Sequence, residues 1–200
     1  MGRMRELVVA TTNKKKKKEL VELLRGTGVD IITLDEFQAS PRVREDKKTF
    51  RGNAVKKAVV ISKFTNRLAL AEDSGLEVMA MGGLPGVRSA RFAGPSKNDA
   101  ANIKKLLGML QGVAGSKRKA RFVCFAALAD KGRLIKAVSG TVEGVISLEP
   151  KGRFGFGYDP VFYYPPLKKT FAQISASRKN RISHRFKALR KIKRILREDP

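Results

Sequence analysis

Short apolar runs alternate with segments of helical periodicity along the first part of the chain. Residues 7–10 and 68–71 are entirely apolar, as expected for strands of a sheet that is buried on both faces, and residues 30–34 are a further strand candidate. Residues 19–24 and 53–60 instead repeat apolar side chains at helical spacing. Strands that alternate with helices predict an α/β fold, built as a mixed twisted sheet flanked by helices.

The pattern changes in the second half of the chain. Residues 119–129 and 133–146 are β-rich runs, and the sequence at 130–132, Asp-Lys-Gly, is typical of a hairpin turn. Antiparallel strands inserted in an α/β chain predict a second lobe, and a cleft between two lobes is a usual place for a ligand. We therefore expect one two-lobed domain over residues 1–200 with a central nucleotide-binding cleft.

Two further helices are predicted in this half. Residues 96–110 have helical periodicity, with Ser96 or Asn98 as the N-cap. A second helix is predicted directly after Ser183, which is its N-cap. One face of this helix is apolar and the opposite face is densely basic. Its apolar stripe consists of Phe186, Leu189, Ile192 and Leu196.

The charge of the chain is strongly positive. Forty-three Lys and Arg residues stand against eighteen Asp and Glu residues, which gives a formal net charge of +25. Such a balance favours polyanionic partners: nucleotides, nucleic acid or an anionic membrane surface. No apolar run approaches the ~20 residues of a membrane span, so we expect no membrane insertion.

Cysteine usage indicates the compartment. Cys124 is the only cysteine, so an intrachain disulfide is excluded, and its apolar neighbours predict a small buried side chain. The apolar run at 7–10 is too short for the core of a secretory signal. We expect a cytoplasmic protein.

Two adjacent carboxylates, Glu72 and Asp73, directly follow the apolar run at 68–71, and Ser74-Gly75 breaks it. In α/β folds, ligands usually bind beyond the carboxyl ends of the strands. The alternative is an exposed acidic turn with no function.

Two loops have the composition of ligand sites. Residues 11–13, Thr-Thr-Asn, lie between a strand and a helix, where free N–H groups and the helix dipole bind anions. The lysine run at 14–18 either adds phosphate ligands or forms a solvated helix face. The glycine-aromatic segment at 152–160 either stacks on a base or packs under the sheet.

Several motifs in order resemble the inosine/xanthosine triphosphate pyrophosphatases, and the similarity spans about residue 7 to about residue 191. The central signature of that family is similar to residues 72–78, 83–87 and 89–92 of this chain, and further motifs are similar to 155–160 and 179–185. The resemblance implies hydrolysis of non-canonical purine triphosphates (ITP, dITP and XTP) to a monophosphate and pyrophosphate. It also implies Mg²⁺ as the cofactor and a homodimer.

The resemblance assigns roles to individual residues. Glu45 and Asp73 are implied metal ligands, and Asp73 is implied to be catalytic, by deprotonating or orienting the attacking water. The implied substrate-binding residues are Thr11, Thr12, Asn13, Lys14, Lys15, Lys16, Asn53, Lys57, Ser74, Phe156, Gly157, Tyr158, Asp159, Lys179, His184 and Arg185.

The chain departs from the family pattern at a few positions. Lys47 stands where the family often has glycine, and Gly52 where it often has glutamate. A carboxylate missing near the metal is expected to weaken or reposition the ion. The family also commonly has a glycine just before the position of Lys16. In this chain that position belongs to the lysine run at 14–18.

Base selectivity has a physical explanation within the resemblance. Hypoxanthine and xanthine carry an acceptor at position 6, where adenine carries an amino donor. Donors from Arg185, or from backbone N–H groups near it, would pair with that acceptor, and such a site rejects the analogue by roughly 10⁴-fold. His184, the only histidine, is either structural or a substrate contact in the same element.

A rival interpretation is a nucleic-acid-binding protein on an inactive enzyme scaffold. The charge of +25 and the basic C-terminal helix support it. The retained carboxylates and motifs favour the enzyme, so nucleic acid is not the favoured partner.

Overall fold

The computed structural model describes residues 5–198, and the chain divides into two compact units. The first unit contains the residues up to 73, residues 124–140 and the residues from 185 onward. The second unit contains residues 74–123 and 141–184. Within residues 5–198, no helix is both long enough and apolar enough to span a membrane.

The strands form one seven-stranded sheet in the order β2-β1-β3-β4-β5-β6-β7. Their bounds are β1 Glu6–Val9, β2 Asp30–Thr33, β3 Leu68–Val78, β4 Lys119–Asp130, β5 Arg133–Ile146, β6 Phe162–Tyr164 and β7 Lys169–Thr170. Strand β1 pairs in parallel with β2 and β3, whereas β6 pairs antiparallel with β5 and β7. The predicted α/β fold with a mixed sheet is therefore confirmed.

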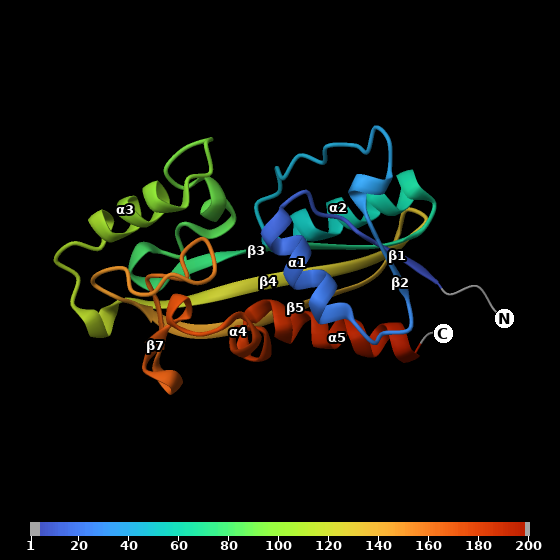
Figure 1. The fold of residues 1–200 in the computed structure, drawn as a ribbon. Coiled ribbons are helices and arrows are strands. Elements are labelled where there is room, and N and C mark those ends of the chain that lie inside the picture. Colours follow the sequence, from blue (N-terminus) through green and yellow to red (C-terminus); the bar gives the residue numbers. More distant parts are fainter. Residues whose placement is uncertain (1–4, 199–200) are drawn as a thin grey trace. The chain divides into compact units, whose positions relative to one another are not determined.

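Five α-helices accompany the sheet in the described part of the chain (Figure 1). They are α1 Lys14–Leu24, α2 Phe50–Thr65, α3 Asp99–Met109, α4 Ala176–Ile182 and α5 His184–Glu198. Of the two N-caps predicted for α3, the structure uses Asn98, whose side chain accepts from the N–H of Ala101.

The core of the first unit lies on both faces of its strands. Leu7 and Val9 pack in a cluster with residues of α1 and α5, whereas Val8 and Ala10 pack in a cluster with residues of α2. Successive strand residues point to opposite faces, so a strand covered on both sides must be apolar at every position. This explains the unbroken apolar run of β1.

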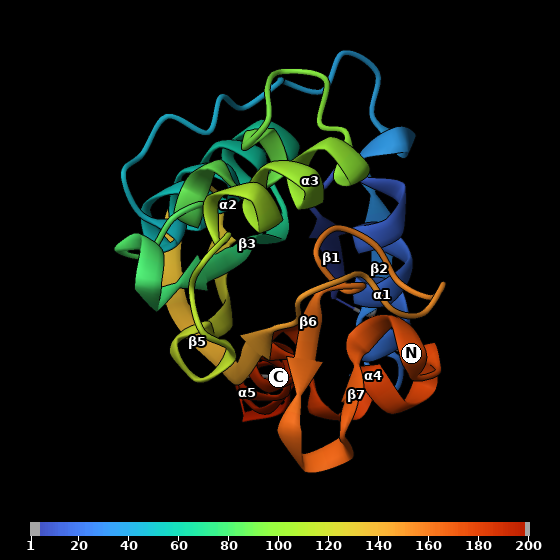
Figure 2. The same cartoon turned by 90° about the vertical axis from the view of Figure 1, so that its left-hand side faces the viewer.

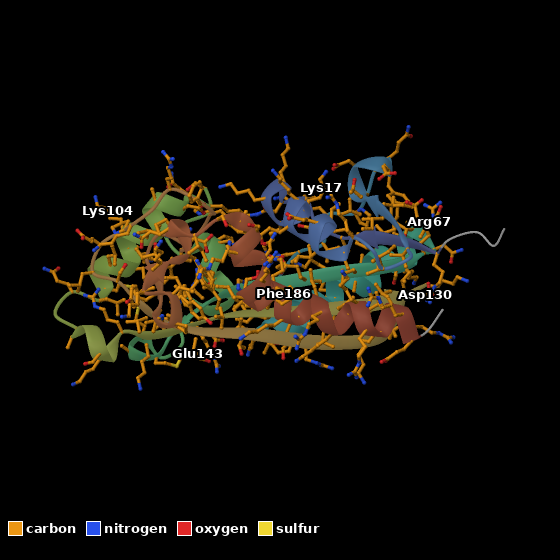
Figure 3. The ribbon with its side chains drawn as sticks, turned by 60° about the horizontal axis from the view of Figure 1, so that its bottom comes forward. Lys17, Arg67, Lys104, Asp130, Glu143 and Phe186 are labelled. Carbon is orange, nitrogen blue, oxygen red and sulfur yellow. The ribbon has the colours of Figure 1, made fainter. Side chains whose placement is uncertain are left out.

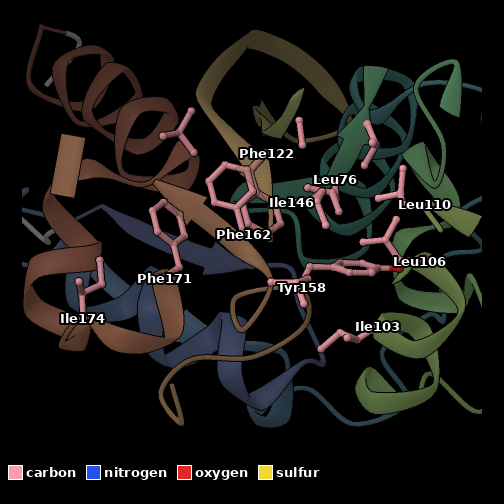
Figure 4. Packing of buried hydrophobic residues seen from close by; sticks show 14 residues of the cluster. Leu76, Ile103, Leu106, Leu110, Phe122, Ile146, Tyr158, Phe162, Phe171 and Ile174 are labelled. Carbon is pink, nitrogen blue, oxygen red and sulfur yellow. The ribbon is translucent and has the colours of Figure 1, made fainter. Parts of the chain in front are cut away.

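The core of the second unit combines aliphatic side chains with a group of aromatic rings (Figure 4). The ring of Phe122 lies 4.5 Å from that of Phe162, and Phe162 lies 4.9 Å from Phe171, measured between ring centroids. The short strands β6 and β7, with α4 near them, belong to this unit (Figure 2).

The predicted end of β3 at Ala71 is wrong, because the strand continues to Val78. Leu76 and Val78 are buried in the core of the second unit, and this packing keeps the Ser-Gly step extended. The parallel neighbour β1 nevertheless stops at Val9, opposite Leu70. Asp73 therefore still lies beyond the carboxyl end of a parallel strand.

The helix boundaries also differ from the prediction. Helix α1 begins at Lys14, five residues before the predicted helical segment 19–24, and the lysine run forms its first turns. Helix α4 was not predicted, and Ser183 is its C-cap, but the predicted C-terminal helix does begin directly after Ser183, as α5. The hairpin turn after β4 is confirmed: Lys131 and Gly132 both have positive φ, 46° and 83°, as a type I′ turn requires.

Candidate active site

Glu72 and Asp73 occupy adjacent positions of β3 and are both buried, with 2% and 6% of their surface exposed. Neighbouring strand residues point to opposite faces. Glu72 shares its face with Cys124, and Asp73 lies on the face that α2 covers. The two carboxylates of the motif therefore have different surroundings.

Glu72 is the centre of a charged network. Its carboxylate accepts from the Nζ of Lys16 at 2.9 Å, from the Nε of Arg185 at 3.1 Å and from the Sγ of Cys124 at 3.1 Å. Arg185 also donates to Glu19. Burial alone would raise the pKa of Glu72, but the two cations hold that pKa well below its usual range.

Lys16 enters this network from the start of α1. The Asn13 side chain caps the helix by accepting from the N–H groups of Lys15 and Lys16, at 3.0 and 3.1 Å. Thr11 in turn accepts from the N–H of Asn13 at 3.2 Å. Burial would lower the pKa of Lys16, but Glu72 raises it overall, so the ammonium stays charged. The predicted phosphate loop thus combines a helix N-terminus with a fixed cation.

The other predicted side chains of this loop are open to solvent. Thr12, Lys14 and Lys15 are exposed. Their contact with substrate stays a prediction.

Asp73 is held by an amide. The Nδ2 of Asn53, on α2, donates to the Oδ2 of Asp73 at 2.9 Å, and the Oδ1 of Asn53 accepts from the N–H of Lys47 at 2.9 Å. Burial raises the pKa of Asp73, and the nearby Glu45 adds to this, although Lys57 and Lys16 act in the opposite direction. A buried carboxylate with a raised pKa suits a general base.

Lys57 connects the carboxylate of Glu45 to the backbone of β3. Its Nζ donates to the Oε1 of Glu45 and to the backbone carbonyl of Glu72, both at 2.6 Å. Helix α2 therefore supplies both Asn53 and Lys57, one turn apart.

Glu45 and Asp73 fit the Mg²⁺ that the family resemblance implies. Glu45 contributes to the raised pKa of Asp73, because the negative charges of the two carboxylates repel each other. Mg²⁺ characteristically binds one or two carboxylates and completes its shell with water and substrate phosphates. Within residues 5–198 no group of three or more His, Cys, Asp or Glu side chains could hold a metal ion, and binding of Mg²⁺ by Glu45 and Asp73 stays a prediction.

The two departures from the family pattern at Lys47 and Gly52 are structurally connected. Gly52 is the third residue of α2, and its N–H donates to the capping hydroxyl of Thr49 at 3.0 Å. A glutamate at this position completes a capping box. A Cβ on residue 52 would lie only 2.9 Å from the Cβ of Lys47. The side chain of Lys47 thus occupies the space that a side chain at position 52 would need.

This contact predicts coupled effects on stability. Gly52→Glu alone should lose most of the expected capping gain because it displaces the Lys47 side chain, whereas Gly52→Glu with Lys47→Gly should form the capping box without that clash. We expect a coupling of roughly 0.5–3 kcal/mol between the two substitutions in a urea-denaturation double-mutant cycle. Arg51→Gln, which lowers the net charge by one at the same exposed helix end, is the control. Additive effects would contradict the coupling.

The glycine-aromatic loop belongs to the second unit and is preformed by Asp159. The Oδ2 of Asp159 accepts from the N–H of Phe156 at 2.9 Å and from the Nζ of Lys179 at 2.7 Å. The same Nζ lies 4.7 Å from the centroid of the Phe156 ring. Gly155 has φ +79°, and a Cβ there would lie 2.0 Å from the Oδ2 of Asp159, so only glycine fits.

The other predicted residues of this region have mixed surroundings. Tyr158 is buried, Ser74 and Gly157 are partly buried, and the His184 ring stacks on Phe122 with 4.9 Å between centroids. His184 is thus packed in the core of its unit, as the structural alternative expects. A substrate contact of these residues stays a prediction.

Arg185 belongs to the first unit, and only 1% of its surface is exposed. Its guanidinium pairs with Glu72 and Glu19. The sequence did not predict these two ion pairs. A direct hydrogen bond from Arg185 to the base stays a prediction. Glu19 and Cys124 were missed as partners, since neither belongs to a motif and both lie far from Glu72 in sequence.

The mixed sheet, with carboxylates and lysines gathered beyond the end of β1, defines an α/β protein with a charged site at the carboxyl end of that strand. The chain belongs to the Ham1 family, whose model matches residues 7–195.

Relatives of similar length support this membership. The chain is 52% identical over 191 residues to a dITP/XTP pyrophosphatase of Desulforamulus reducens, covering 96% of this chain and 95% of the relative. It is 44% identical to that of Bacillus subtilis, covering 96% and 98%. Among solved structures, a HAM1 protein from Coxiella burnetii superposes with a TM-score of 0.90 at 40% identity, covering 98% of this chain and all of that chain.

Proposed function

We propose that this protein hydrolyses the non-canonical purine nucleoside triphosphates ITP, dITP and XTP to the monophosphate and pyrophosphate. The observation that carries the proposal is the cluster of Asp73, Glu45, Lys57 and Lys16. It occurs in a chain 44–52% identical to relatives named dITP/XTP pyrophosphatases over nearly the full length of both. Such a reaction would cleanse the nucleotide pool.

Asp73 is the proposed general base. Its raised pKa favours accepting a proton from the attacking water, and Asn53 fixes the orientation of the carboxylate. The water attacks the α-phosphorus in line with the leaving pyrophosphate. Lys16 and Lys57 hold the phosphates as point charges. When bound by Glu45 and Asp73, Mg²⁺ supplies further charge neutralisation on the leaving group.

The glycine-aromatic loop is the proposed base platform. Phe156 is partly exposed and offers a ring face for stacking, while Lys179 lies over the ring. Arg185, or N–H groups near it, would donate to the acceptor at position 6 of hypoxanthine or xanthine. An unpaired donor on adenine would disfavour that base.

Pyrophosphate release from inosine, xanthosine, adenosine and guanosine triphosphates tests this function. We expect the first two to be preferred over adenosine triphosphate by up to roughly 10⁴-fold in kcat/KM. A chelator should abolish turnover, and added Mg²⁺ should restore it. Equal turnover of all four nucleotides, or release of orthophosphate instead of pyrophosphate, would overturn the proposal.

The rival function, nucleic-acid binding, rests on the positive charge. Basic side chains extend from elements of both units, such as Lys17 on α1 and Lys104 on α3 (Figure 3). Two lysines of α5, however, donate to carbonyls of their own unit: Lys191 to Ser139 at 2.7 Å and Lys193 to Arg25 at 2.9 Å. Part of the basic helix is therefore used for packing. Tight RNA or DNA binding that falls steeply with salt, without nucleotide turnover, would favour the rival.

The proposed location is the cytoplasm, where the nucleotide substrates are found, and the single cysteine agrees with it. The proposed oligomeric state is a homodimer, which rests on the family resemblance. Light scattering of the eluted protein tests the oligomeric state.

A further inference from the structure

The segment that presents Phe156 is tied to helix α3 by a side chain outside the motifs. The Oδ2 of Asp99, the first residue of α3, accepts from the backbone N–H of Gly157 at 2.9 Å. We propose that Asp99 is a positioning residue that fixes the Phe156 ring for stacking on the purine. This inference rests on the proposed function, because it assumes that Phe156 stacks on the base.

Carboxylates hold both peptide groups that flank Phe156. The N–H of the preceding peptide, which belongs to Phe156 itself, donates to Asp159 at 2.9 Å. The N–H of the following peptide belongs to Gly157 and donates to Asp99. Fixing both peptide planes fixes the φ and ψ of Phe156, and with them the direction in which its side chain leaves the backbone.

The hydrogen bonds that Asp159 and Asp99 accept connect the loop to different parts of the chain. Asp159 lies three residues from Phe156, so its bond shapes the loop only locally. Asp99 is separated from Gly157 by 58 positions, so its bond anchors the loop to another element. Gly157 has φ +63°, which a glycine adopts without strain, so its own backbone does little to hold this geometry. Asp99 therefore adds an anchor from α3 at the residue directly after Phe156, beside the bond between Asp159 and Lys179.

Helix α3 is a firm support for this anchor. Asn98 caps it, and Asn102 bonds the backbone on both sides of the preceding turn, accepting from the N–H of Ala93 at 2.7 Å and donating to the carbonyl of Ala90 at 3.2 Å. The buried face of α3 includes Ile103 and Leu106, in the same core cluster as Tyr158. A negative charge in the first turn is also favourable at the positive end of the helix dipole.

Tyr158 completes the attachment beside the hydrogen bond from Gly157 to Asp99. Its hydroxyl donates to the carbonyl of Ser89 at 2.9 Å, and its ring points toward α3 (Figure 4). Burial, with the nearby Asp99 charge, raises the pKa of Tyr158, so the phenol keeps its proton and continues to donate. Three consecutive residues, Phe156 to Tyr158, are thus held by three different parts of the second unit.

The experiment uses the Phe156→Trp variant as the background, because the chain has no tryptophan of its own. Fluorescence then reports on the platform as inosine monophosphate is titrated. Asp99→Ala should weaken binding of this nucleotide on the order of 10-fold, as expected for a partly lost base–aromatic stack. Pyrophosphate, which has no base, should inhibit turnover with an unchanged constant. Asp99→Asn should restore most of the affinity, because its amide oxygen still accepts.

Asn98→Ala is the matched control. It removes the cap of the same helix and lowers the melting temperature, but it leaves the bond to Gly157, so nucleotide affinity should not change. If Asn98→Ala weakens binding as much as Asp99→Ala, or if Asp99→Ala binds normally, the positioning role is wrong. Should Asp99→Ala not fold, Asp99→Glu displaces the acceptor by one methylene and carries the same test. A wild-type protein that releases no pyrophosphate from inosine triphosphate would overturn the proposed function instead.

Discussion

Replacement of Asp73 by asparagine is expected to abolish nearly all turnover, by more than about 10³-fold, without unfolding the protein. Asparagine cannot accept a proton from water, and a neutral amide is a poor ligand for Mg²⁺. The shape is conserved, and the new Oδ1 can still accept from Asn53, as the carboxylate does at 2.9 Å. Pyrophosphate release from inosine triphosphate measures the loss. Retained turnover would remove Asp73 from its proposed role.

The same variant should be at least as stable as the wild type at neutral pH. The folded-state pKa of Asp73 is raised above 3.8, mainly by burial. The folded protein therefore binds this proton more tightly than the unfolded chain does. The ionised form therefore costs stability once the pH exceeds the raised pKa, and this cost disappears below about pH 3.8. Melting temperatures should thus show a gain for Asp73→Asn at pH 7 that shrinks as the pH falls toward 3.8.

Asp46→Asn is the control for this pH dependence. Asp46 is exposed, and its hydrogen bond to Lys56, at 2.8 Å, lowers its pKa. The pKa shift of Asp46 is opposite in sign to that of Asp73, so Asp46→Asn should lower stability slightly at pH 7. Turnover should be unchanged. A gain in stability for both variants would mean that the effect is only a reduction of charge.

The parts of the fold that follow from the sequence are those where local pattern and packing agree. The apolar run of β1 is unbroken because both of its faces are covered, and the hairpin at Lys131-Gly132 has residues that adopt positive φ readily. The prediction failed at β3, where Ser74-Gly75 has the composition of a turn. There the burial of Leu76 and Val78 decides the conformation, and such packing is not visible in the local sequence.

The candidate site could be predicted only as a set of residues. The motifs identify Glu72, Asp73 and Lys16, but the partners of Glu72 come from α1, β4 and α5, as far as 113 positions away. The spacing of these residues has no periodicity that would reveal the network. The structure also distinguishes the two adjacent acids: one is committed to buried cations, whereas the other has a raised pKa.

Loss of the Glu72 charge should be the most destabilising single change in this site. Glu72→Gln leaves Lys16 without its carboxylate and leaves Arg185, a nearly fully buried cation, with Glu19 as its remaining carboxylate in the network. Removing one partner of a buried ion pair typically costs about 3–5 kcal/mol, because a buried charge is left uncompensated. Urea denaturation at pH 7 should show a loss of this size.

The pH dependence distinguishes this explanation from a simple packing defect. The folded-state pKa of Glu72 lies well below 4.5, so its stabilisation is fully present above pH 4.5 and is lost as the pH falls through the folded-state value. The difference between wild type and Glu72→Gln should therefore narrow below pH 4.5, whereas a packing defect would persist. Glu149→Gln removes the same charge from an exposed pair with Lys151, and should change stability by less than about 1 kcal/mol. Equal losses for the two variants would show that the buried network contributes no more than a surface ion pair.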